Sequence, residues 1–399
     1  MKETTLWKSV VLPVGLCIKD GMIWFIQNGG NQIMGMDMHS FQIRKHIRIP
    51  CMPWGNSFFH RKLNDKIVDI GNRMLILLNG SKTIYAYNFS SGEIDVLTCL
   101  PNGKTFRNNS ILYQNRTLYL LPYQSNYLLK YDIDNDDWEE IQITDHNICF
   151  EKCFEIDNDI ILAVDSNSNR VYQYNICKNI IEISLVGDKN NHYWGITKAQ
   201  GYYVMPHSDK CAVTLWKKEA GETYEIADFP DSFRSVKGYA YLNMYKTEND
   251  VLLIPYYANI ILKIDVRSKS ISNIFPQNCF WLNDCPNRID DEKMAYYSST
   301  MYNKRLYLYS VTRQNWHVLD TITMDMGPFN QCKMEEEDNE CIGMLFDDNS
   351  KQFFLGYESS FTCCNLKNLI LSIRKSIESC RKTESYYGAD IWNYLKDKI

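Results

Sequence analysis

The amino-acid sequence predicts an all-β protein, and two observations lead to this expectation. Aromatic residues make up 13% of the 399 residues, with 27 tyrosines among them, and side chains of this type favour strands. The sequence also repeats itself, because an apolar strand that ends at a small polar residue recurs about every 47 residues. A period of that length is typical of four-stranded blades, so we predict a β-propeller.

The recurring strand sets the register of the repeats. Six clear copies and two weaker ones end at Asp37, Asn88, Asp132, Asn175, Trp216 and Asp265, and at Ser310 and Asn365. The segment YSVTRQNW, which ends at Trp316, aligns without a gap to YDIDNDDW, which ends at Trp138, and this alignment supports the Ser310 copy. Counting every copy predicts eight blades. If the Asn365 copy is a cap instead, the propeller has seven.

The N-terminal segment has the features of an outer strand that lacks the rest of its blade. The sequence LWKSVVLP, residues 6–13, opens with a tryptophan and closes with Leu-Pro, as the outer strands of other repeats do. The three strands that it lacks are predicted at residues 341–346, 352–357 and 360–365. We therefore expect the N-terminal strand to pair with the C-terminal repeat and close the ring, because closure removes exposed sheet edges.

The repeats end near residue 366, so residues 1–366 form the predicted propeller and residues 367–399 a separate C-terminal segment. In this segment Leu369, Ile370, Ile373 and Ile377 have helical spacing. A second short helix is predicted over residues 389–396, with Trp392 and Leu395 on its apolar side. The helical tail either caps the propeller or docks into a partner.

Composition excludes several classes of protein. The net charge of −5 argues against nucleic acid as a partner, since polyanion binders are basic. No apolar stretch approaches the roughly 20 residues of a membrane helix, and the N-terminus lacks the order of a secretory signal. The 14 cysteines are scattered over apolar strand positions, which favours reduced thiols. We expect a cytoplasmic protein with no membrane span.

The blade period, the aromatic strands and the YD…W element resemble those of kelch-like β-propellers, at the level of the superfamily. The double glycine of kelch repeats occurs once, at Gly29-Gly30. The resemblance therefore implies the fold and no particular activity, because propellers serve both as scaffolds and as enzymes.

A ligand site is expected on the face where the turns between second and third strands meet the loops between blades. Ten residues before three of the repeat ends stands a proline, followed by Tyr123, His207 or Tyr256. The loops between blades add further aromatic and basic residues to the same rim. The candidate ligand-binding residues are Trp54, Arg107, Tyr123, His192, Trp194, His207, Arg234, Tyr256 and Trp281.

These residue types suit ligand binding better than they suit a recognised catalytic motif. Arginine beside an aromatic ring, as at Arg107 and Arg234, can hold a carboxylate or phosphate, and exposed tryptophan and tyrosine faces bind sugars or peptides. His192 and His207 belong to one repeat and could act as acid and base or share a metal. No phosphate loop, nucleophile elbow or zinc-ligand spacing is present in the sequence, so no cofactor or metal is predicted.

The sequence thus favours a non-catalytic propeller that holds a peptide, glycan or partner protein on its channel rim. In the alternative interpretation it is a cytoplasmic hydrolase, lyase or epimerase that acts on an anionic small molecule or a sugar, with His192 and His207 as catalytic candidates. Trp392 and Leu395 are the candidate partner-docking residues of the tail.

Overall fold

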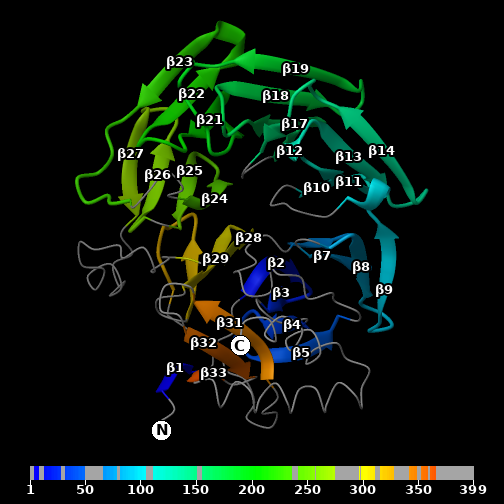
Figure 1. Cartoon of the computed structure of the whole chain (residues 1–399). Helices are drawn as coiled ribbons and strands as arrows, with labels where there is room; N and C mark the ends of the chain where they lie inside the picture. Colours follow the sequence, from blue (N-terminus) through cyan, green and yellow to red (C-terminus); the bar gives the residue numbers. More distant parts are fainter. Residues whose placement is uncertain are drawn as a thin grey trace. The chain divides into compact units, whose positions relative to one another are not determined.

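The structure, a computed structural model, describes residues 4–8, 13–27, 32–49, 66–78, 81–104, 111–150, 155–235, 241–256, 258–274, 296, 298–310, 315–327, 341–347, 352–357 and 360–364. These residues form an all-β propeller of antiparallel sheets (Figure 1). The chain divides into two compact units. The first comprises residues 1–107, 314–316 and 329–399, and the second comprises residues 108–313 and 317–328.

Three four-stranded sheets belong to the first unit. One contains β2 (Pro13–Lys19), β3 (Met22–Gln27), β4 (Gln32–Asp37) and β5 (Ile43–Arg48), and the next contains β6 (Lys66–Asp69), β7 (Arg73–Leu77), β8 (Thr83–Asn88) and β9 (Ile94–Cys99). The third combines β31 (Cys341–Asp347), β32 (Gln352–Tyr357) and β33 (Ser360–Cys364) with β1 (Thr4–Lys8) from the N-terminal segment.

The second unit contains four four-stranded sheets. The first consists of β10 (Ile111–Gln114), β11 (Thr117–Leu120), β13 (Tyr127–Asp132) and β14 (Asp137–Gln142), and the second of β16 (Glu155–Asp157), β17 (Ile160–Val164), β18 (Arg170–Asn175) and β19 (Ile180–Leu185). The third consists of β20 (Thr197–Ala199), β21 (Tyr202–Pro206), β22 (Val213–Lys217) and β23 (Glu222–Ile226), and the fourth of β24 (Tyr241–Lys246), β25 (Asp250–Pro255), β26 (Ile261–Asp265) and β27 (Ser270–Ile274). A two-stranded ribbon joins β12 (Tyr123–Ser125) to β15 (Ile148–Cys149).

The predicted pairing of the N-terminal strand with the last repeat is confirmed. β1 runs antiparallel to β33, with Thr4 opposite Cys363 and Lys8 opposite Ser360. The order of this sheet is β1-β33-β32-β31, so the N-terminal segment supplies its outer strand. A strand from the start of the sequence therefore covers an edge that the C-terminal strands would otherwise leave open.

The expectation of eight four-stranded blades is wrong, because the described part of the chain contains seven sheets of four strands. The repeat near Ser310 contributes β28 (Ser298–Tyr302), β29 (Arg305–Ser310) and β30 (Asn315–Asp320), a sheet of three strands within the described residues. The alignment of Trp316 with Trp138 is also wrong. Trp138 lies on an outer strand and stacks on Tyr131, with ring centroids 4.7 Å apart, whereas Trp316 lies on β30 and is buried against Phe25 and Phe41.

In most of the described repeats a small polar residue ends the third strand and caps the turn that follows. The side chain of Asp265 accepts hydrogen bonds from the backbone N–H groups of Arg267 (2.9 Å) and Ser268 (3.0 Å). The same contact recurs at the equivalent residues Asp37, Asn88, Asp132 and Asn175, and at Asp320 in place of Ser310. Asp320 is thus the true end of the seventh copy, and the pattern has a physical basis in Asx turns.

Replacement of Asp265 with alanine should lower the free energy of unfolding by about 1 kcal/mol, since two backbone donors lose their acceptor. Asp265→Asn keeps an acceptor oxygen at the same place, as Asn88 and Asn175 do in their repeats, and should leave stability nearly unchanged. Urea unfolding of the two variants checks this, and equal losses in both would contradict the capping role.

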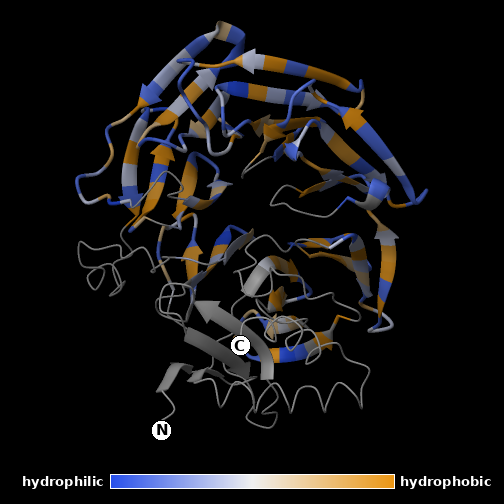
Figure 2. Ribbon diagram, in the orientation of Figure 1, coloured by the Kyte–Doolittle hydropathy of each residue, from blue (hydrophilic) through white to orange (hydrophobic). Residues whose placement is uncertain are grey.

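The core lies between neighbouring sheets, where apolar side chains of one sheet pack against those of the next. In the second unit one cluster joins Phe150 and Ile161 to Tyr119, a second joins Tyr193 and Met205 to Leu162, and a third joins Leu253 to Leu215. Figure 2 shows the hydrophobic residues of β25 and β26 as orange bands. Such stacking leaves the turns at the two ends of each sheet free to carry polar groups.

The predicted C-terminal helices, with Trp392 and Leu395, lie outside the described residues and stay a prediction. The helices of the described chain are two short 3-10 turns, Pro101–Gly103 and Lys218–Ala220. No helix of this part of the chain has the length and apolar character needed to cross a membrane.

Candidate functional site

In the second unit the loops between blades are hydrogen-bonded to the turns between second and third strands. The N–H of Trp194 donates to the carbonyl of Pro206 (2.8 Å), and the N–H of Ser208 donates to the carbonyl of His192 (2.9 Å). One blade further on, the N–H of Asn259 donates to the carbonyl of Arg234 (3.1 Å). The predicted meeting of loops and turns on one face is therefore confirmed for these repeats. We call this surface the rim, and backbone hydrogen bonds hold its loops to its turns.

His192 and His207 lie close to one carboxylate on this rim. Tyr193 forms a β-bridge with His207, and its ring packs edge-on against the imidazole at 5.0 Å. Asp209 lies between the two histidines, with carboxylate oxygens 3.8 Å from Nδ1 of His207 and 4.0 Å from Nδ1 of His192. The described residues contain no group of three His, Cys, Asp or Glu side chains that could hold a metal ion.

The imidazole of His207 is fully buried. Its Nε2 shares a hydrogen bond of 2.8 Å with the hydroxyl of Thr214, and its Nδ1 has no hydrogen-bond partner among the described residues. Burial, together with the nearby ammonium of Lys210, lowers the pKa of His207 to about 4, although the carboxylates of Glu225 and Asp209 act in the opposite direction. At neutral pH the ring is therefore uncharged and closed off from solvent, which does not suit an acid–base catalyst.

Two predicted aromatic ligand contacts belong to the core. Trp194 is completely buried and packs edge-on against Tyr241, with ring centroids 5.7 Å apart. Tyr256 is also buried. The expectation that these rings present exposed faces is wrong, because the interblade loop directs Trp194 inward between neighbouring sheets.

Arg234 is exposed, but its own loop occupies part of its guanidinium. Nη1 donates to the carbonyls of Asp231 (2.6 Å) and Phe233 (2.7 Å). The backbone of the same residue is fixed by Asn259, whose side-chain oxygen accepts the N–H of Arg234 at 2.8 Å. This arginine holds the loop against the next turn, and only its remaining donors can face a ligand.

Several predicted residues cannot be placed. Trp54, Arg107 and Trp281 lie outside the described residues, and for Tyr123 the structure gives the backbone alone, in β12. Sequence reasoning missed Asp165, which is buried at the equivalent turn of the β16–β19 sheet and accepts hydrogen bonds from Ser168 Oγ (2.8 Å) and the N–H of Asn167 (3.1 Å). Most of the polar groups that the structure describes on this rim are thus hydrogen-bonded to other groups of the rim.

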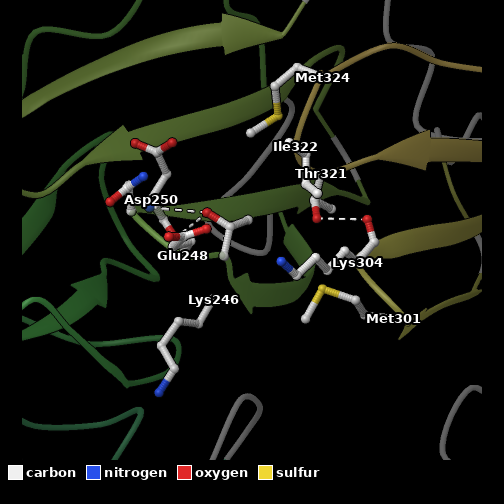
Figure 3. A pocket seen from close by; sticks show the side chains of 10 residues that line it. Lys246, Glu248, Asp250, Met301, Lys304, Thr321, Ile322 and Met324 are labelled. Carbon is white, nitrogen blue, oxygen red and sulfur yellow. Dashed lines mark hydrogen bonds between the residues drawn. The ribbon is translucent and has the colours of Figure 1, made fainter.

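A pocket of about 470 Å³ lies at the other end of the strands, where first-to-second and third-to-fourth turns meet (Figure 3). The turn between β24 and β25 supplies one wall, and the turns that follow β28 and β30 supply the other. Its lining consists of Lys246, Thr247, Glu248, Asn249, Asp250, Met301, Lys304, Thr321, Ile322 and Met324. No sequence pattern predicted this pocket, because residues 246–250 of one wall are far in the sequence from residues 301–324 of the other, and each wall is an ordinary polar turn.

The turns of the pocket are rigidly held. The hydroxyl of Thr247 accepts the N–H of Asp250 (3.0 Å) and donates to its carbonyl (3.1 Å), and the hydroxyl of Thr321 donates to the carbonyl of Lys304 (2.7 Å). Figure 3 shows these bonds on the two walls. A site built on fixed turns loses little freedom when a ligand binds.

The charged groups of the pocket are largely uncommitted. Lys246, Lys304 and Glu248 form no ion pair within the described residues, whereas Asp250 lies 3.7 Å from the ammonium of Lys263. Met301 and Ile322 are exposed beside them. The pocket thus combines two exposed apolar side chains with two ammonium groups that have no acidic partner among the described residues.

No protein-family model and no curated protein sequence matches the chain. Among solved structures it is similar to PorZ, a bacterial surface component of the type-IX secretion system of Porphyromonas gingivalis, with 11% identity over 88% of this chain and a TM-score of 0.54. The chain spans 42% of the length of PorZ. The likeness supports the propeller fold.

Two further structures cover much of their own length. Virginiamycin B lyase from Staphylococcus aureus is 13% identical over 91% of this chain and 98% of its own, with a TM-score of 0.41. BamB from Moraxella catarrhalis is 12% identical over 75% and 82%, with a TM-score of 0.47. Because one fold can carry many functions, the function of this chain must be argued from its site.

Proposed function

We propose that this chain is a non-catalytic binding module and that a segment of a partner protein occupies the pocket between the turns of β24–β25 and β28–β29. The observation that carries the proposal is the pair of lysines, Lys246 and Lys304, which have no ion-pair partner in the described chain and stand beside exposed Met301 and Ile322. Interfaces combine apolar anchors with a charged rim in this way.

The rim also supports a non-catalytic function, because its described side chains already make contacts within the protein. His207 is closed off from solvent, and Arg234, the predicted rim arginine that the structure describes, donates to its own loop. An enzyme needs converging titratable groups that reach a substrate. The described groups on the rim instead hold the loops in place. The open, charged pocket therefore offers a partner more unpaired groups than the rim does.

Reversal of both pocket charges, Lys246→Glu with Lys304→Glu, should weaken binding of the partner at least about tenfold. The lysines suit an acidic segment of the partner, and the two glutamates would repel that segment. Partners are captured with the intact protein, identified by mass spectrometry, purified and titrated by calorimetry. The matched control is Lys82→Glu with Lys217→Glu, which makes the same change of net charge on exposed lysines that do not line the pocket.

A partner that binds both double variants with equal affinity would contradict the pocket assignment. Conversion of a co-purified small molecule by the wild-type protein, lost on His192→Ala, would contradict the non-catalytic assignment and restore the enzyme interpretation.

A further inference from the structure

The outer strand of one blade, β19, carries exposed apolar side chains on both faces of its sheet. Ile180, Ile183 and Leu185 are 52%, 47% and 72% exposed. The other outer strands whose side chains are described carry at most one exposed large hydrophobic residue each, such as Val96 on β9. β14 has the sequence DWEEIQ, and β27 has the polar sequence SISNI. Outer strands normally carry charge or polarity because an apolar edge invites pairing with another strand.

The main chain of β19 is also available for pairing. β19 ends the strand order β16-β17-β18-β19, and no other described strand pairs with it. Along an antiparallel strand the hydrogen-bonding direction alternates, and the N–H of Val186 donates to Asn169 on the β18 side (3.0 Å). Even-numbered residues therefore face β18. The N–H and C=O groups of Ile181, Ile183 and Leu185 point outward.

We propose that a second copy of this chain pairs with β19, so that two β19 strands meet antiparallel about a two-fold axis at Ile183. Only registers that match outward-facing residues of both strands can form hydrogen bonds. With Ile183 opposite its own copy, Ile181 lies opposite Leu185 of the other chain, and all the outward groups of the strand are bonded. The two sheets then join into one continuous sheet of eight strands.

The side chains agree with the same register. Ile183 meets Ile183, and Ile181 meets Leu185, so the apolar side chains of this face gain apolar cross-strand partners. Ile180, on the opposite face, lies level with Val186 of the other chain. Lys178 precedes the strand and Asp188 follows it, and the register brings Lys178 of each chain level with Asp188 of the other. Glu182 faces Ser184 and is already paired with Lys218 of its own chain at 2.7 Å. No like charges are opposed, which favours a second copy over an unrelated strand. The proposal does not depend on what the pocket binds.

Sedimentation velocity of the full chain is the first test. Wild-type protein should self-associate with a dissociation constant on the order of 10 µM, as expected for a small interface. Ile183→Lys places two ammonium groups across the axis and should weaken association at least about thirtyfold. The matched control is Val96→Lys, since Val96 is 59% exposed on the outer strand β9, and it should leave association unchanged. Thermal unfolding confirms that both variants are folded.

Two readouts test the register. Lys178→Asp and Asp188→Lys should each weaken the dimer roughly three- to tenfold, and the double variant should restore it. Amide hydrogen exchange at rising protein concentration should slow at Ile181, Ile183 and Leu185 and not at the even-numbered residues, which are bonded to β18 in the monomer. A protein that stays monomeric up to about 200 µM, or a dimer that survives Ile183→Lys, overturns the proposal.

Discussion

Replacement of Trp194 with alanine should lower the free energy of unfolding by about 3–5 kcal/mol, the usual cost of removing a large aromatic side chain from a core. The indole is completely buried in a cluster that includes Val213, Leu253 and Tyr241. Its removal would leave a cavity between two neighbouring sheets, and backbone bonds on both sides of the residue prevent the loop from collapsing into it. Urea unfolding, followed by circular dichroism, measures the loss.

Trp194→Phe is the matched control. The indole Nε1 has no hydrogen-bond partner in the described structure, so a phenyl ring forfeits volume and no polar contact. We expect a loss of about 1 kcal/mol or slightly more. A Trp194→Ala variant that is as stable as wild type, yet loses affinity for a ligand, would return this residue to the rim surface that the sequence predicted.

Stability should fall by about 3 kcal/mol as the pH is lowered from 6.5 to 4, because of His207 alone. The pKa of this imidazole is about 4 in the folded chain and near 6.5 in the unfolded chain. Between these values the unfolded chain binds the proton and the folded chain does not, so acid favours unfolding. The stabilisation is fully present above pH 6.5 and is lost as the pH falls towards 4.

The His207→Gln variant isolates this contribution. Glutamine cannot be protonated in this range, so the difference in unfolding free energy between wild type and variant should shrink steadily below pH 6.5. Above pH 7 the difference should be constant, which serves as an internal control. Parallel pH profiles for the two proteins would show that another group accounts for the acid sensitivity. Unfolding in urea at closely spaced pH values gives both profiles.

Local sequence patterns predicted the features of the fold that rest on local chemistry. The recurring Asp or Asn marked the end of the third strand because its side chain caps the following turn, as at Asp265. The pattern failed at Trp216, where a 3-10 turn and Gly221 in the left-handed conformation take the place of the cap. It failed again at Ser310, because a strand that merely contains Trp316 looks like an outer strand until its sheet neighbours are known.

The candidate site was harder to predict, because burial depends on distant residues. The sequence placed His192 and His207 on one face correctly, since both flank strand ends of the same repeat. It could not show that Thr214 and Tyr193 enclose His207, nor that Tyr241, 47 residues after Trp194, covers the indole. The pocket residues Lys246 and Lys304 are even farther apart in the sequence, and each belongs to a turn with no recognisable motif.

The pairing of β1 with β33 has a consequence for the order in which the molecule is assembled. Thr4 lies opposite Cys363, so this sheet joins segments that are almost the whole chain apart, while every other four-stranded sheet is made from strands that lie close together in the sequence. During synthesis on the ribosome, the other sheets can form as their strands emerge. β1 must wait until β33 has been synthesised. Contacts of such sequence separation are slow to form. The final step of folding is therefore expected to be the capture of the N-terminal strand, and until then β33 offers an open edge to any other strand in reach.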